Sequence, residues 1–245
     1  MRKFFVTGSS KGIGRAITEL LLPEPDVEVT GISRTNTLQN KRFVHIPLNL
    51  EDVLQLAAIV DGIFNDHTDF EEVVLINNAG YLGDIKYLGD IDHQEFIKVM
   101  NVNVIAPAIL MNAFIRSFKD AGGKKVIVNI GSGAGRHPYD GWGAYCSSKA
   151  AVDMLSEVGD METSIRQNGF RIVSLAPGPV DSSMQEVVRS TANTDFSQIH
   201  KFIALKESGQ LPSVEETAEK IISFIDRIDQ FDGSILDIRK MPLSL

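Results

Sequence analysis

The sequence predicts an α/β protein built on a parallel sheet with helices on both faces. Short segments rich in β-branched and aromatic residues alternate with longer segments of helical periodicity along the chain. Most of the short segments are apolar almost throughout, as expected for parallel strands that are covered on both faces. The chain has 245 residues, of which 43% are hydrophobic and 23% are charged, which is typical of one globular domain. These observations predict a single doubly wound domain over residues 1–245.

Seven segments are predicted to be strands of a mostly parallel sheet. They are residues 3–7, 27–33, 42–48, 73–77, 125–130, 170–176 and 233–238. Helices are predicted between them at 12–22, 51–66, 92–118, 147–168 and 213–228. Ser213 and Glu216 have the spacing of a capping box, and Gly169 is suited to end the preceding helix. Such sheets bind ligands at the carboxyl ends of their strands.

The segment 182–211 is the longest stretch between a strand and a capped helix. It mixes polar residues with apolar side chains, including Met184, Phe196 and Phe202. We interpret it as one or two short helices that close over a substrate as a lid. An ordinary surface helical hairpin is the alternative.

The net charge of −8 argues against nucleic acid or an anionic membrane as the main partner, because both require an extended basic face. Cys146 is the only cysteine, which excludes an intrachain disulfide and fits a reducing compartment. The apolar run at the N-terminus is too short for a signal peptide, and the run 102–115 is interrupted and shorter than a membrane span. No cluster has metal-ligand spacing. We therefore expect a cytoplasmic protein without a metal.

A glycine-rich turn follows the first predicted strand and opens a helix. In this turn, Gly8, Gly12 and Gly14 let backbone N–H groups and the helix N-terminus approach a pyrophosphate. This position in a parallel sheet is that of a Rossmann-type dinucleotide site, although a plain strand–helix turn is the alternative. The predicted contacts of the turn are Gly8, Ser10, Lys11, Gly12, Ile13 and Gly14.

The end of the second strand predicts which dinucleotide binds. A site for NAD usually has an acidic residue there for the ribose hydroxyls, whereas a 2′-phosphate requires a cation. This chain has Arg34 at that point and Lys11 in the glycine turn, and both cations can form charge-assisted hydrogen bonds with a phosphate. The pattern favours NADPH over NADH. Asn49, followed by Leu50, either binds the adenine or finishes a turn.

The fourth strand ends in Asn77-Asn78-Ala79-Gly80. Small residues and side-chain amides at this point let the chain pass close over a ribose and fix neighbouring strands. We expect Asn78, Ala79 and Gly80 to contact the cofactor. For Asn77 an asparagine turn is an equally good interpretation.

Ser132, Tyr145 and Lys149 form the candidate reaction centre. Tyr145 and Lys149 are four residues apart and so share one face of a helix. An ammonium group next to a phenol favours the phenolate and lowers the phenol pKa from about 10. Ser132 follows the fifth strand, where its hydroxyl can polarise a carbonyl oxygen while Tyr145 supplies a proton. A packed tyrosine beside a lysine is the structural alternative.

These motifs together resemble the short-chain dehydrogenase/reductases over nearly the whole chain. TGSSKGIG (7–14), NNAG (77–80) and YCSSK (145–149) match the motifs of that family. The resemblance implies that Asn103 holds a water that connects Lys149 to a proton relay. It also implies that PGPVDSS (177–183) grips the nicotinamide, with contacts from Pro177, Gly178, Val180 and Ser182. Ser182 replaces a common threonine and Asn49 replaces the usual aspartate.

Residues 132–150 and 189–211 resemble the members that reduce aromatic 1,2-diketones with NADPH and, more distantly, those that reduce pteridines. The resemblance implies reduction of one carbonyl, with Ser132, Tyr145, Trp142 and Met184 at the substrate. Trp142 either stacks on the substrate or packs against another subunit. A pteridine or 3-oxoacyl thioester reductase is the alternative enzyme, and a non-catalytic dinucleotide sensor is the alternative without catalysis. Pairing of the long helices implies a homodimer or homotetramer.

Overall fold

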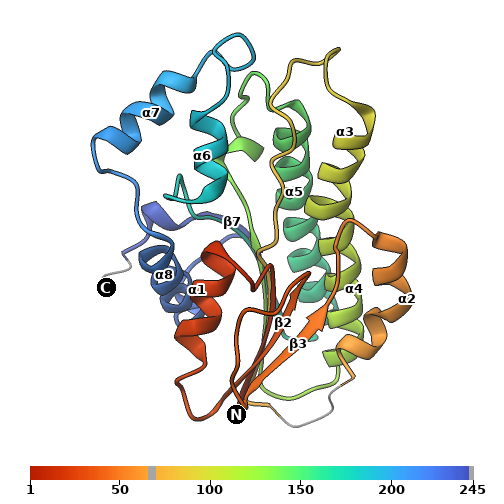
Figure 1. The fold of residues 1–245 in the computed structure, drawn as a ribbon. Helices are drawn as coiled ribbons and strands as arrows, with labels where there is room; N and C mark the ends of the chain where they lie inside the picture. Colours follow the sequence, from red (N-terminus) through yellow and green to blue (C-terminus); the bar gives the residue numbers. More distant parts are fainter. Residues whose placement is uncertain (66–69, 243–245) are drawn as a thin grey trace.

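The computed structural model describes residues 1–65 and 70–242, which form one seven-stranded parallel sheet with helices on both faces (Figure 1). The strand order is β3-β2-β1-β4-β5-β6-β7. The strands are β1 (Arg2–Thr7), β2 (Val27–Ser33), β3 (Phe43–Pro47), β4 (Glu72–Asn77), β5 (Lys124–Ile130), β6 (Phe170–Ala176) and β7 (Ile235–Asp237). The predicted doubly wound fold is confirmed. The strand order reverses direction at β1 and β4, which is where such sheets bind ligands.

Helices α1 (Gly12–Leu21) and α8 (Val214–Asp226) cover one face of the sheet (Figure 1). Helices α2 (Val53–Ile63), α4 (Ala106–Phe118) and α5 (Gly143–Arg166) cover the other. Side chains alternate between two cores: Phe4 packs with the first group, whereas Phe5 packs with the second. This double burial explains why the central strands are apolar almost throughout, whereas the edge strands β3 and β7 are partly exposed. The predicted capping box of Ser213 and Glu216 is present at the start of α8.

Helix α3 (His93–Met100) continues through a π-helical turn, Asn101–Ile105, into α4. The continuous helix has 26 residues and a mean hydropathy of 1.4 in its most apolar window, so by length and composition it could cross a membrane. The helix agrees with the prediction of a helix at 92–118. What differs is the expectation about a membrane span, since the whole helix meets that test although polar residues interrupt the apolar run 102–115 within it. Leu110 and Phe114 lie in the core against the sheet. A core helix of a globular protein has the same properties, so this segment is weak support for a membrane span.

Helix α5 begins at Gly143, four residues before the predicted start at 147. The two glycines around Trp142 favour a loop by composition, but Ala144 and Tyr145 are buried and hold the first turn in place. Tyr145 therefore lies inside the helix with Lys149 one turn later. At the other end, Gln167 takes the left-handed conformation with φ of 54°, and Gly169 follows with φ of 75°.

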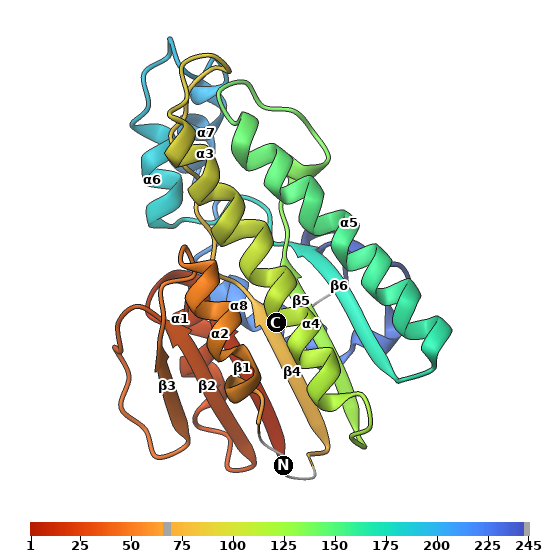
Figure 2. The same ribbon diagram turned by 90° about the vertical axis from the view of Figure 1, so that its right-hand side faces the viewer.

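The segment 182–211 contains two short helices, α6 (Ser183–Arg189) and α7 (Ile199–Glu207). Figure 2 shows both beyond the carboxyl ends of the strands. Phe196, between them, is fully buried and stacks on Trp142 with ring centroids 5.2 Å apart. Polar contacts fix the same region, since Asp140 accepts a 2.7 Å hydrogen bond from the Ser197 amide. The segment is thus packed onto the sheet domain.

Candidate functional site

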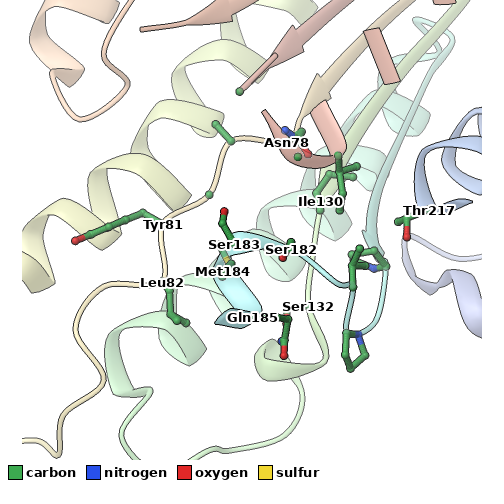
Figure 3. Close-up of a pocket in the computed structure, with 18 of the residues that line it drawn as sticks. Asn78, Tyr81, Leu82, Ile130, Ser132, Ser182, Ser183, Met184, Gln185 and Thr217 are labelled. Carbon is green, nitrogen blue, oxygen red and sulfur yellow. The ribbon is translucent and has the colours of Figure 1, made fainter. Parts of the chain in front are cut away.

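A cleft of about 1030 Å³ runs along the carboxyl edge of the sheet, from the glycine-rich turn to α6 and α7. Figure 3 shows Asn78 after β4, Ser132 after β5 and Met184 on α6 around this cavity. Residues that follow β1, β2, β3, β4, β5 and β6 therefore meet, together with side chains of α5, α6 and α7, at the edge where ligands bind such sheets. Every predicted cofactor or substrate residue except Asn103 lines this cleft or, for Gly14, supports its wall.

The glycine-rich turn fits a pyrophosphate. Gly8 and Gly12 have φ of 69° and 57°, which favour glycine. A Cβ on Gly14 would lie 2.5 Å from the Gly8 carbonyl oxygen, so only glycine permits this close approach of helix to turn. The first turn of α1 has no side-chain cap, and its N–H groups are available to an anion.

The predicted phosphate and adenine residues line the far end of the cleft. Arg34, after β2, and Lys11, in the glycine turn, are both exposed there. This pair of cations fits a 2′-phosphate. The Asn49 side chain accepts a 3.3 Å hydrogen bond from the Glu51 amide, so it finishes a turn while it lines the cleft.

Asn78 fixes the floor of the cleft by joining β4 to β1. Its amide side chain donates to the Thr7 carbonyl at 2.9 Å, and the Thr7 hydroxyl accepts from the amides of Asn78 and Ala79 at 3.0 Å. Asn77 instead points into the sheet and donates to Asn129 at 2.8 Å. Of the two asparagines, only Asn78 lines the cleft.

Ser132, Tyr145 and Lys149 lie together in the middle of the cleft. The Lys149 ammonium donates a 2.8 Å hydrogen bond to the Ile130 carbonyl and lies 5.7 Å from the centroid of the Tyr145 ring. The Ser132 hydroxyl accepts a hydrogen bond from the Ala134 amide at 3.1 Å. The short loop after β5 therefore brings Ser132 next to Tyr145 and Lys149, which lie further along the chain on α5.

The electrostatics of Tyr145 differ from the prediction. Burial raises its pKa from 10.0 to about 12, although the contact with Ser132 lowers it in part. Burial also lowers the pKa of Lys149 from 10.5 to about 8. Both shifts have one cause, because a low-dielectric surrounding disfavours the charged form of either group. The expected lowering of the Tyr145 pKa by the neighbouring ammonium is therefore wrong: burial dominates, only the contact with Ser132 lowers the pKa, and Tyr145 is a protonated phenol at neutral pH.

Asn103 lies in the π-helical turn and is buried next to the site. Its amide group holds the backbone of Tyr81 by two hydrogen bonds of 2.8 Å and donates to the Ser148 hydroxyl at 3.0 Å. It therefore connects the segment after β4 to α5. The two N–H groups are occupied by protein partners, which leaves only the amide oxygen to accept from a further group.

The segment after β6, which is predicted to hold the nicotinamide, forms the end of the cleft next to α6. Pro177, Gly178, Val180 and Ser182 line it together with Met184. Gly178 has φ of 78°, and a Cβ there would lie 2.7 Å from the Arg239 side chain. Trp142 also lines the cleft, but Phe196 stacks on one of its faces. Trp142 therefore packs against its own chain on that face, which is not accessible to a substrate.

Comparison with known proteins identifies the family. A family model for short chain dehydrogenases matches residues 2–193. The chain belongs to the short-chain dehydrogenase family. Two relatives called benzil reductase ((S)-benzoin forming), from Bacillus cereus and Bacillus subtilis, are 36% identical and cover 97% and 98% of this chain and 99% of their own lengths. Sepiapterin reductase from Rattus norvegicus is 32% identical over 95% of this chain and 94% of its own length.

Solved structures agree in fold. A short-chain dehydrogenase/reductase from Saccharomyces cerevisiae has a TM-score of 0.84 at 24% identity and covers 100% of this chain and 98% of its own. One from Burkholderia cenocepacia, solved in complex with NADP, has a TM-score of 0.74 at 22% identity, covering 96% and 86%. Short-chain dehydrogenases are oxidoreductases that use a nicotinamide dinucleotide. This chain is therefore an oxidoreductase of that kind.

The sequence analysis missed a buried carboxylate beside the short-chain dehydrogenase motif. Asp153 lies one turn after Lys149, and both side chains are buried. Asp153 is held by Arg136, whose Nε donates at 2.9 Å, and by the Ser174 hydroxyl. It acts on Lys149 by raising the pKa that burial lowers. Its spacing, four residues after Lys149 on the same helix face, is the signal that could have found it.

Proposed function

We propose that the protein is an NADPH-dependent carbonyl reductase that reduces one carbonyl of an aromatic 1,2-diketone. The observation that carries the proposal is the meeting of Ser132, Tyr145 and Lys149 in one cleft with the glycine-rich turn. The rings of Tyr139 and Trp142 line the cleft beside Tyr145 and form an aromatic wall, with their centroids 4.9 Å apart. This wall supports the substrate class, because an aromatic substrate can pack against aromatic side chains. The two relatives at 36% identity are named for this reaction, which yields (S)-benzoin.

The proposed roles follow from the protonation states at the site. A nicotinamide dinucleotide held by the glycine-rich turn and the segment after β6 would supply the hydride for the carbonyl carbon. The Ser132 hydroxyl holds and polarises the carbonyl oxygen, and the Tyr145 phenol gives that oxygen a proton. The raised pKa of Tyr145 suits a proton donor, because the phenol keeps its proton until the substrate oxygen becomes basic. Lys149 stabilises the phenolate that remains, and Asn103 is a positioning residue that holds α5 against the loop after β4.

NADPH is the proposed cofactor because of the two cations at the adenine end of the cleft. Arg34 and Lys11 both line the cleft, and neither forms an ion pair among the described residues. An anionic 2′-phosphate would neutralise both, whereas the hydroxyls of NADH would leave them unpaired.

The test is an assay of NADPH consumption with a panel of diketones, pteridines and 3-oxoacyl esters, followed by chiral analysis of the alcohol. We expect an aromatic 1,2-diketone to be reduced fastest. Tyr145→Phe should lower kcat by at least about 100-fold while it leaves NADPH binding intact. Equal rates for the wild type and Tyr145→Phe would support a dinucleotide-binding module instead. Faster reduction of a pteridine would favour the activity for which the sepiapterin reductases are named.

We also propose that residues 1–245 form one domain, that 182–211 is a substrate lid, and that the protein is a cytoplasmic homodimer or homotetramer. An apolar face on α5 supports self-association: Met154, Met161 and Ile165 recur at helical spacing and are 58%, 56% and 73% exposed. Exposed apolar residues grouped on one helix face are typical of an interface between chains. Sedimentation of the purified protein tests the assembly.

A further inference from the structure

The wall of the cleft is basic although the whole chain is acidic. Among the described residues that line it are seven lysines and arginines but only two glutamates, whereas the chain has a net charge of −8. Lys11, Arg34 and Lys149 have roles in the function proposed above. Lys201, on α7, and Arg239, beside Gly178, line the end of the cleft where the substrate is proposed to bind. The proposed cofactor contacts assign no role to either of these two cations.

Lys201 carries an uncompensated charge. Its ammonium lies 5.5 Å from the centroid of the Tyr139 ring and 6.0 Å from that of Phe202, and no described residue forms a hydrogen bond or ion pair with its side chain. Arg239 differs, because two of its nitrogens donate to Asp237 at 2.9 and 2.6 Å. Lys201 is therefore the cation at this end that is available to an anion.

The aromatic wall leads from the reaction centre to Lys201. The Tyr145 ring lies 5.7 Å from that of Trp142, and the Trp142 ring lies 4.9 Å from that of Tyr139. The Lys201 ammonium lies over the Tyr139 ring. A substrate whose carbonyl meets Tyr145 and whose aromatic ring follows this wall brings its far edge towards Lys201.

We propose that this end of the cleft recognises an anionic substituent, such as a carboxylate, on the aromatic part of the substrate, with Lys201 as the specificity-determining residue. The inference rests on the proposed carbonyl reductase and names its substrate class more closely. The Lys201 side chain is exposed and has no carboxylate partner among the described residues, so an anionic substituent that reaches it would gain an ion pair of the strength usual at a protein surface. The N–H-rich edge of a pteridine would instead require an acceptor at this point.

The experiment compares two substrates in the full-length enzyme with NADPH: a neutral aromatic 1,2-diketone and the same diketone with a para-carboxylate on one ring. The readout is the ratio of kcat/KM for the carboxylate to that for the neutral compound. We expect a ratio of about five in the wild type at low salt, the most that one exposed ion pair usually contributes. The ratio should fall towards one at about 1 M salt because screening removes the attraction.

Lys201→Gln should lower the ratio to about one and Lys201→Glu should lower it below one. Lys119→Gln, at the C-terminal end of α4 and outside the cleft, removes the same charge and is the matched control; it should keep the wild-type ratio. A wild-type ratio of one, or equal ratios for Lys201→Gln and the control, would overturn the inference and leave the reductase standing. Failure of the wild type to reduce either diketone would overturn the proposed function itself.

Discussion

Replacing Gly135 by alanine tests whether the loop that carries Ser132 must touch the helix that carries Tyr145. A Cβ at Gly135 would lie 2.8 Å from the carbonyl carbon of Lys149 and 2.9 Å from the amide nitrogen of Ala150. Normal contacts between such atoms are about 3.5 Å or longer, so the two segments must separate by roughly 0.7 Å. We expect a loss of about 1–3 kcal/mol in the free energy of unfolding, the usual cost of overpacking. We also expect kcat to fall by about 10- to 100-fold, because the reacting groups move apart.

Gly133→Ala is the matched control in the same loop. No atom lies within 4 Å of a Cβ at that position, so its stability should change by less than about 0.5 kcal/mol. The assays are thermal unfolding, in which each kcal/mol corresponds to about 2–4 °C for a chain of this length, and NADPH-dependent turnover. Equal stability and turnover in the two alanine variants would show that the close contact of loop and helix does not set the geometry of the site.

Three further predictions concern the cofactor, the pH profile and the assembly. Arg34→Asp should shift the ratio of kcat/KM for NADPH to that for NADH by at least about tenfold towards NADH; an unchanged ratio would mean that the phosphate is held elsewhere. Reduction should decline as pH rises through about 8, where Lys149 loses its proton, and Asp153→Asn should move that decline to lower pH; a profile flat from pH 6 to 10 would refute the role of Lys149. Met161→Glu should lower the sedimenting mass by placing charge on the apolar face of α5, whereas an unchanged mass would exclude that face as the interface.

The order of elements was predictable because each strand and helix is consistent with its local pattern. The boundaries that differ are set by tertiary contacts. Composition around Trp142 favours a loop, yet burial of Tyr145 draws Gly143 into α5. The helix through Asn103, by contrast, was predicted as continuous, and it stays continuous at this polar position because the Asn103 side chain has a buried partner in Ser148.

Site residues were predictable where their role depends on the spacing of residues within one short segment of the sequence. Tyr145 and Lys149, and the glycine-rich turn, are of this kind. The partners of these residues across the fold were not predictable: Arg136 meets Asp153, and Lys201 meets Tyr139, only after distant segments pack together. The pKa values were predicted in the wrong direction for Tyr145, because pair spacing gives the neighbouring charge but not the degree of burial.

The burial of Lys149 is better explained by chemistry than by stability. Its pKa is lowered in the folded state from 10.5 to about 8, so the unfolded chain binds the proton more tightly. The folded state therefore loses stability as pH falls from 10.5, and the loss is complete below about 8. A shift of this size corresponds to roughly 3 kcal/mol at neutral pH, a large fraction of the stability of a typical domain. Asp153 offsets part of this cost, and Arg136 and Ser174 hold its carboxylate in place. A methionine would fill the same space without the penalty. Lys149 is destabilising as an ammonium, yet it lies beside the Tyr145 phenol in the cleft. We infer that its positive charge is required for the reaction rather than for folding.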